Sequence, residues 1–227
     1  MASTRQAGLR RTRAVVALCR GRLLALRSVR AARMLAALVA AGFAVAALVL
    51  RVTDGEGASL EGLTITAAHW IVWIAGVPLA FAAAEDHASI DRREGVEALA
   101  AMRGISPTSL DSARALGAMT AVAWAIGAPL AALALLTAAL AGGGSAALHR
   151  IGLGVAALAF AGIAGVTLGG VGSACGRAGR ARGRWLLAAI LVGPWALADL
   201  AGRGAWSIPG ALGAVLDFLL GTGSASS

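Results

Sequence analysis

Histidine and cysteine are the residues of this chain best suited to catalysis or metal binding, and both are scarce. The 227 residues include three histidines, His69, His87 and His149, and two cysteines, Cys19 and Cys175. No two of them have the spacing of metal ligands, and no nucleophile stands in a pattern with a base. The sequence therefore predicts no catalytic residue, no metal site and no cofactor, which disfavours an integral-membrane enzyme.

A glycine-rich run at residues 169–183 raises the question of nucleotide binding. A phosphate-binding loop of the Walker A type needs a lysine that contacts the phosphates, and all 20 basic residues of this chain are arginines. We therefore expect that the chain itself hydrolyses no ATP. The net charge of +9 does not indicate nucleic acid as a partner either, because no basic face is interleaved with aromatic residues.

The most charged of the predicted loops lies at residues 85–110. Within it we predict a short helix over residues 91–103, with Ser89 as its N-cap and Asp91 in its first turn. Gly95 falls inside this predicted helix, where glycine costs about 1 kcal/mol relative to alanine. Close packing of another molecule at Gly95 would explain such a residue, and a solvated connector helix is the alternative.

The residues that follow this helix predict a sharp turn. Gly104 suits the left-handed position just beyond a helix end, with Arg103 in the last turn. Ser106 and Pro107 suit the N-cap and the first turn of the next helix. The chain is thus expected to form a short surface helix, to turn, and to begin a long apolar helix.

Six apolar segments make up most of the remaining chain. With 59% hydrophobic and 14% charged residues, the chain has too few polar side chains to cover a water-soluble domain of its length. Uncharged apolar runs of this length are typical of membrane spans, since a bilayer core about 30 Å thick takes about 20 helical residues. We predict an all-α integral membrane protein with about six transmembrane helices, at residues 34–50, 63–84, 115–141, 151–176, 185–199 and 203–220.

The last two of these segments are less regular than the others. Both are short, they contain Pro194 and Pro209, and the sixth carries Asp217. They are therefore either two full crossings or a hairpin that does not cross. We expect residues 34–220 to form one transmembrane domain, followed by a flexible tail at residues 221–227.

The distribution of arginine predicts the orientation in the membrane. Cytoplasmic loops carry an excess of basic residues. With a cytoplasmic N-terminus, seventeen arginines are inside: nine before residue 34, four after the second span and four after the fourth. The external loops hold three, Arg51, Arg150 and Arg203. We therefore predict a multi-pass protein of the bacterial inner membrane with a cytoplasmic N-terminus.

Residues 1–33 hold nine arginines and no acidic residue. Arg13, Arg20 and Arg27 are spaced seven apart and would share one side of a helix, with Leu18 and Leu26 among the apolar residues opposite. This pattern predicts an amphipathic helix at the surface of an anionic bilayer. A mitochondrial transit peptide and the n-region of a signal sequence are two alternatives.

The fourth predicted span carries glycines at intervals of three or four residues. They place bare backbone on one helical face, which permits the close approach of a second helix. This strip does not distinguish a contact within the chain from a seam between two copies. The predicted packing residues are Gly162, Gly165, Gly169, Gly172 and Gly176.

The loop between the second and third predicted spans resembles that of the type-two ABC transporter permeases, the membrane subunits of many exporters. The resemblance covers residues 65–200, and Gly104 and Ala100 depart from it, where a proline and a second leucine are common. The residues that match in the loop are Arg93-Glu94-Gly95, Glu97, Leu99, Ser106-Pro107 and Arg114-Ala115-Leu116-Gly117. Those that match at the end of the fourth span are Leu168-Gly169, Ser173 and Arg177.

The resemblance implies a permease subunit whose loop helix docks into a groove of a separate ATPase. Its implied partners are an ABC ATPase subunit, a second permease copy or a homologous permease, and the lipid bilayer. Closure of the ATPase pair would push on the loop helix and tilt the spans behind it. The residues that it assigns to the ATPase-coupling interface are Arg93, Glu94, Gly95, Glu97, Leu99, Met102 and Arg103.

Two other functions fit part of the sequence. A haem-export permease of cytochrome c maturation has a similar length and a similar loop, and His69 or His149 would then be candidates to contact haem. A membrane scaffold without transport activity would not need the loop pattern. The sequence does not indicate which substrate an exporter of this kind would carry.

Overall fold

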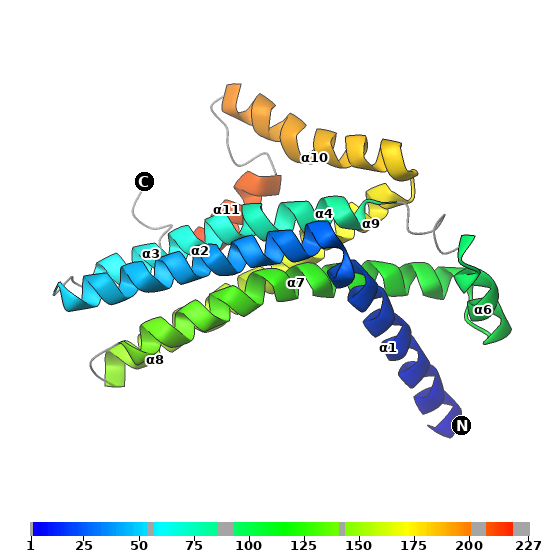
Figure 1. Cartoon of the computed structure of the whole chain (residues 1–227), viewed down its shortest axis with the longest axis horizontal. Coiled ribbons are helices and arrows are strands. Elements are labelled where there is room, and N and C mark those ends of the chain that lie inside the picture. The colour runs from blue at the N-terminus through cyan, green and yellow to red at the C-terminus, as the bar shows by residue number, and fades with distance from the viewer. Residues whose placement is uncertain (1, 54–56, 86–92, 141–143, 201–207, 220–227) are drawn as a thin grey trace.

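Helices account for almost all of the structure. The computed structural model describes residues 2–53, 57–85, 93–140, 144–200 and 208–219, of which 92% are helical and none is in a strand. The all-α prediction is therefore confirmed. Figure 1 shows most helices aligned along one direction, with α1 leaving this bundle at a steep angle.

Four helical stretches are long and apolar enough to cross a membrane, which indicates a membrane protein. They agree with the first four predicted spans to within a few residues, except that the first and third helices begin earlier. The first is α2 (Arg27–Val52) and the third is α7 (Pro107–Ala139). The second runs from Gly62 to Ala83 through α3 (Gly57–Ile71), η1 (Val72–Gly76) and α4 (Val77–Ala83). The fourth runs from Ala147 to Gly176 through α8 (Gly144–Ala164), η2 (Gly165–Gly169) and α9 (Gly170–Gly176).

The last two predicted segments correspond to α10 (Arg180–Leu200) and α11 (Ile208–Leu219). Pro194 lies within α10, and α11 has 12 residues, fewer than the about 20 that a bilayer core requires. Neither is among the spans that the described part of the chain contains, so the count of six is not confirmed. Residues 201–207, with Arg203, and the tail at residues 221–227 lie outside the described residues.

The second and fourth spans each contain a π-helical turn, η1 and η2. In such a turn each N–H group donates to the carbonyl five residues back, which widens the helix locally. Pro78 is the second residue after η1, and because it has no N–H group it disturbs the regular α-helical ladder. η2 begins at Gly165 and ends at Gly169.

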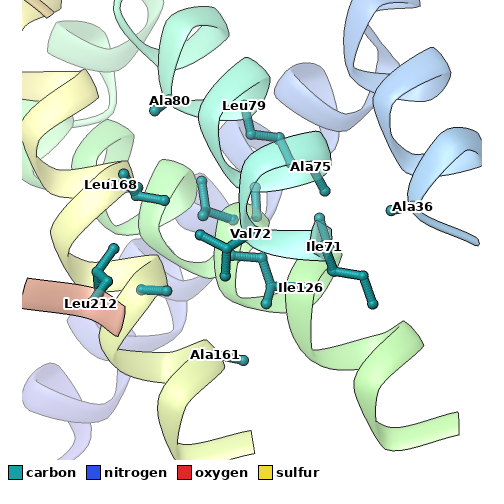
Figure 2. Packing of buried hydrophobic residues seen from close by; sticks show 14 of the residues in the cluster. Ala36, Ile71, Val72, Ala75, Leu79, Ala80, Ile126, Ala161, Leu168 and Leu212 are labelled. Carbon is teal, nitrogen blue, oxygen red and sulfur yellow. The ribbon is translucent and has the colours of Figure 1, made fainter. Parts of the chain in front are cut away.

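The core lies where the second, third and fourth spans meet. Figure 2 shows Ile71, Val72 and Leu79 of the second span, Ile126 of α7 and Leu168 of η2 in this region. The approach is close because Gly76 has no side chain. A Cβ atom on Gly76 would lie 2.9 Å from Leu168 Cδ1 and 3.0 Å from Ile126 Cδ1.

The N-terminal region consists of two helices that meet at Leu26. α1 (Ala2–Ala25) ends before Leu26, whose φ of −60° and ψ of 138° are extended, and α2 begins at Arg27. Arg27 therefore does not share a helix side with Arg13 and Arg20, and that part of the prediction is wrong. The local sequence has no glycine or proline to announce this break.

Candidate coupling region and the cavity beside it

The charged loop folds into a helix that is shorter than predicted, α6 (Val96–Met102). Gly95 precedes it as the N-cap residue, with a φ of 71° and a ψ of 12°. This left-handed conformation disfavours residues that carry a Cβ atom. The prediction that Gly95 lies inside the helix is wrong, and the backbone conformation accounts for the glycine, because no other described atom lies within 4 Å of its Cβ position.

The start of the predicted loop helix and the residues before it lie outside the described residues. They include His87, Ser89, Asp91 and Arg92. The predicted N-cap at Ser89 therefore stays a prediction.

The turn after α6 has the predicted form. Gly104 has a φ of 71°, its N–H group donates to the carbonyl of Ala101, and that of Ile105 donates to the carbonyl of Ala100, both at 2.9 Å. This pair of hydrogen bonds is the Schellman motif of a helix C-terminus. Ser106 Oγ then accepts a hydrogen bond from the N–H group of Ser109 at 3.2 Å. α7 therefore starts at Pro107 with its N-cap in place.

Arg114 of α7 holds α6 and the start of α7 in one arrangement. Its Nη1 atom lies 2.7 Å from Asp111 Oδ1, one turn earlier in α7. Its Nη2 atom lies 3.6 Å from Glu97 Oε1 in α6. Ala100, on the side of α6 that is buried, is only 9% exposed. α6 thus contacts α7, and the Arg114–Glu97 ion pair joins the two helices.

Two further ion pairs connect this region to other helices. Arg22 of α1 pairs with Glu94, just before α6. Arg184 of α10 pairs with Glu85, just after α4. Figure 1 shows α6, the starts of α7 and α10, and the ends of α4 and α9 toward the same end of the bundle. We call this end of the bundle the α6 end.

The other predicted interface residues are on the surface. Leu99 is 53% exposed and Met102 is 76% exposed, one turn apart on α6. Arg93, Glu94 and Arg103 are exposed as well. Leu99 and Met102 thus give α6 two large exposed apolar side chains, whereas Glu97 is paired with Arg114 of α7.

α1 crosses α7 at a glycine of the matched loop pattern. A Cβ atom on Gly117 would lie 2.9 Å from Cys19 Cβ and 3.1 Å from the backbone nitrogen of Arg20. The absence of a side chain at Gly117 therefore allows the two backbones to approach. The sequence carried no sign of this contact, since the N-terminal segment was expected to lie on lipid.

A cavity of about 390 Å³ lies between α1, α7 and the ends of α4 and α9. We call it the α1 cavity. Glu94 and Arg114 from the loop pattern and Ser173 and Arg177 from the span-four pattern line it together. The two stretches that resemble the permease family therefore meet in space. The remaining lining residues are Cys19, Leu23, Ala25, Leu26, Arg22, Ala83, Glu85, Asp111, Ala118 and Gly176.

Four of the five glycines in the predicted strip face other helices of the same chain. A Cβ atom would lie 2.6 Å from Ala123 Cβ at Gly165 and 2.7 Å from Met119 Cα at Gly169. At Gly172 and Gly176 it would meet the carbonyl oxygens of Ala80 at 2.5 Å and Ala83 at 3.1 Å. Gly162 differs, because no other described atom lies within 4 Å of its Cβ position.

The histidines that the structure describes are in different surroundings. His69 of α3 is half-buried, and its Nδ1 atom lies 3.3 Å from the carbonyl oxygen of Ile65. It borders a cavity of only about 20 Å³. His149 of α8 is exposed. Within the described ranges, no three His, Cys, Asp or Glu side chains are grouped as metal ligands would be.

Comparisons of the chain with family models, with curated proteins and with solved structures give no match. The structure indicates the class of protein: a helical membrane protein, with four helices in the described ranges that are long and apolar enough to cross a bilayer.

Proposed function

We propose that this chain is the membrane-spanning permease subunit of an ABC exporter in the bacterial inner membrane. Its N-terminus and the α6 end would face the cytoplasm, and a separate ATPase subunit would hydrolyse ATP. A second permease copy, or a homologous permease, would complete the transporter. The observation that carries the proposal is the exposed apolar pair on α6.

Leu99 and Met102 form an apolar surface on a short helix that already has a buried side. α6 contacts α7 and its Ala100 is buried, so the exposed pair is not needed to hold α6 in place. Protein interfaces commonly have an apolar centre with a charged or polar rim, and here Arg93, Glu94 and Arg103 supply such a rim. These features support a protein partner at α6.

The position of α6 supports a partner in water rather than in lipid. α7 has 33 residues, and at about 1.5 Å per residue it is about 50 Å long, compared with about 30 Å for a bilayer core. Its first turns carry Asp111 and Arg114, which favours placing this end beyond the hydrocarbon. α6, attached to those turns, would then stand clear of the membrane.

The contacts of α6 give a route for force from the ATPase to the spans. Movement of α6 would pass to α7 through Ala100 and the Arg114–Glu97 ion pair, and to α1 through the Arg22–Glu94 ion pair. α7 continues into the core, where it packs against the second and fourth spans. Rigid-body movement of this kind is a common way to convert ligand-driven closure into a change of access.

The test is co-expression with candidate ABC ATPases from the same genome. We expect one of them to co-purify with the chain, with ATPase activity in the complex and none in the chain alone. The double variant Leu99→Asp with Met102→Asp should lower co-purification about tenfold or more, because it places charges at the centre of the interface. Inserted and folded protein should remain, since both side chains are exposed.

The matched control is Ala178→Asp, which adds a charge at an exposed position of the same end. It should leave co-purification unchanged. Normal co-purification and activity of the double variant would contradict an ATPase contact at α6, and would favour a membrane scaffold in which α6 is only a connector.

A further inference from the structure

The α1 cavity has the size of a small-molecule site and two chemically different parts. Its volume of about 390 Å³ falls within the roughly 300–1,000 Å³ that is usual for ligand pockets. Cys19, Arg22, Leu23 and Leu26 face it at intervals of three and four residues, so one side of α1 and the turn after it cover the cavity. Leu23 of α1, Ala83 of α4 and Ala118 of α7 give the cavity its apolar part.

α1 is held over the cavity at two points. Close approach at Gly117 brings it against α7, and the Arg22–Glu94 ion pair joins it to the residues before α6. The cavity therefore results from the crossing of packed helices.

The charges around the cavity leave one cation without a partner among the described residues. Each lining carboxylate is already in an ion pair: Glu94 with Arg22, Asp111 with Arg114, and Glu85 with Arg184. Arg184 does not line the cavity, so it neutralises Glu85 from outside. No hydrogen bond or ion pair to a described residue involves the guanidinium of Arg177. The cavity thus offers a single uncompensated positive charge beside an apolar space.

We propose that the α1 cavity binds an amphipathic anion, with its phosphate or carboxylate group at Arg177. Its hydrocarbon portion lies against Leu23, Ala83 and Ala118, which are all buried. An acidic phospholipid of the surrounding leaflet and a transported amphiphile share this chemistry. The site belongs to the chain itself and needs no ATPase, so its test is independent of the proposed transport function.

The test uses the full chain in lipid nanodiscs that contain equal amounts of phosphatidylglycerol and phosphatidylcholine, followed by native mass spectrometry. Wild-type protein should retain phosphatidylglycerol preferentially. Arg177→Gln should lower this preference about tenfold, the usual effect of losing a charge-assisted hydrogen bond. Arg182→Gln, an exposed arginine of α10 that does not line the cavity, should retain the preference. Equal retention of both lipids by wild-type protein, or an unchanged preference in Arg177→Gln, would overturn the proposal.

A second variant tests the cavity separately from the charge. Ala25 is exposed and lines the cavity, so Ala25→Phe should obstruct it without disturbing the core and should also reduce phosphatidylglycerol retention. Ala17→Phe changes an exposed residue of α1 away from the cavity and should have no effect. Retention by Ala25→Phe equal to that of wild-type protein would place the lipid elsewhere and refute the site.

Soluble competitors distinguish the source of the ligand. Decyl phosphate added to the detergent-purified chain should displace bound phosphatidylglycerol, because it carries both an anion and an apolar chain, whereas inorganic phosphate should not. Equal displacement by inorganic phosphate would refute the apolar part of the site. Resistance of the bound lipid to both competitors would refute a shared site for lipid and soluble amphiphile.

Discussion

The centre of the helix bundle and its α6 end are held together by different interactions. At the centre, glycines allow backbones to touch, as at Gly172 against Ala80 and at Gly169 against Met119. At the α6 end, ion pairs join helices in addition to close contacts such as that of Gly183 with Cys175, and the side chains of Arg22 and Glu94 are each 50% exposed. Ion pairs with such exposure contribute about 0–1 kcal/mol to the free energy of unfolding. The parts of a close-packed core, by contrast, cannot shift gradually past one another.

This difference indicates which part of the molecule can rearrange. The close backbone contacts at the centre favour movement of the second, third and fourth spans as one body. The ion pairs at the α6 end can be exchanged at small energetic cost. A docked partner would therefore act on the part of the molecule that yields most easily.

The largest effect is expected from Gly172→Val. A Cβ atom there would lie 2.5 Å from the carbonyl oxygen of Ala80, and backbone atoms cannot move aside as a flexible side chain can. Overpacking of this kind costs typically about 1–3 kcal/mol, so the variant should show a markedly lower thermal midpoint in detergent and less monodisperse protein. Gly162→Val, in the same span but with free space at Cβ, is the matched control. Equal stability of the two variants would show that the centre is more plastic than its contacts indicate.

An intermediate effect is expected from Gly117→Leu, which separates α1 from α7. The core should stay folded, because this contact lies between α1 and the first half of α7. The thermal midpoint should therefore fall little. α1 should unfold locally more often, since it is no longer packed against α7, and trypsin cleavage at its arginines should accelerate about tenfold. Gly21→Leu, at a site of α1 with free space, should be cleaved like wild-type protein. A slow, wild-type cleavage rate in Gly117→Leu would mean that other contacts suffice to hold α1.

The smallest effect is expected for the ion pair between Arg22 and Glu94. A double-mutant cycle with Arg22→Ala and Glu94→Ala should give a coupling energy of less than about 1 kcal/mol, measured from thermal or denaturant unfolding. High salt should reduce it further, because the pair is exposed. A coupling energy of several kcal/mol would make the α6 end as rigid as the centre and would remove the contrast between them.

Local features of the sequence were sufficient to predict the elements that depend on neighbouring residues. The first four spans follow from apolar runs, and the turn at Gly104, Ser106 and Pro107 follows from residue types with strong positional preferences. Gly95 shows where such reasoning fails. A glycine is compatible both with a helix interior and with a left-handed residue before a helix, and only the backbone angle separates the two.

Features that depend on contacts between distant segments were not predictable. The break at Leu26 has no local signal, and the contact of Gly117 with Cys19 joins residues of an N-terminal helix and a later span. The sequence showed Arg177 only as part of the span-four pattern, because nothing in it indicates that Arg177 lines a cavity together with Arg22 and Glu85. Such sites emerge when helices cross, and the crossing geometry is set by the whole bundle.

The π-helical turn η1 has a consequence for the rotational phase of the second span. A π-helical turn holds about one residue more than an α-helical turn, so every later side chain lies about 100° behind its position in an uninterrupted α-helix of the same sequence. α4 follows η1 directly, so the additional residue sets which of its faces meets α9. If the same residues formed an uninterrupted α-helix, Ala80 would be rotated away from Gly172 and Glu85 away from Arg184. A single inserted position in the membrane thus sets the angular alignment of an ion pair at the far end of the same span.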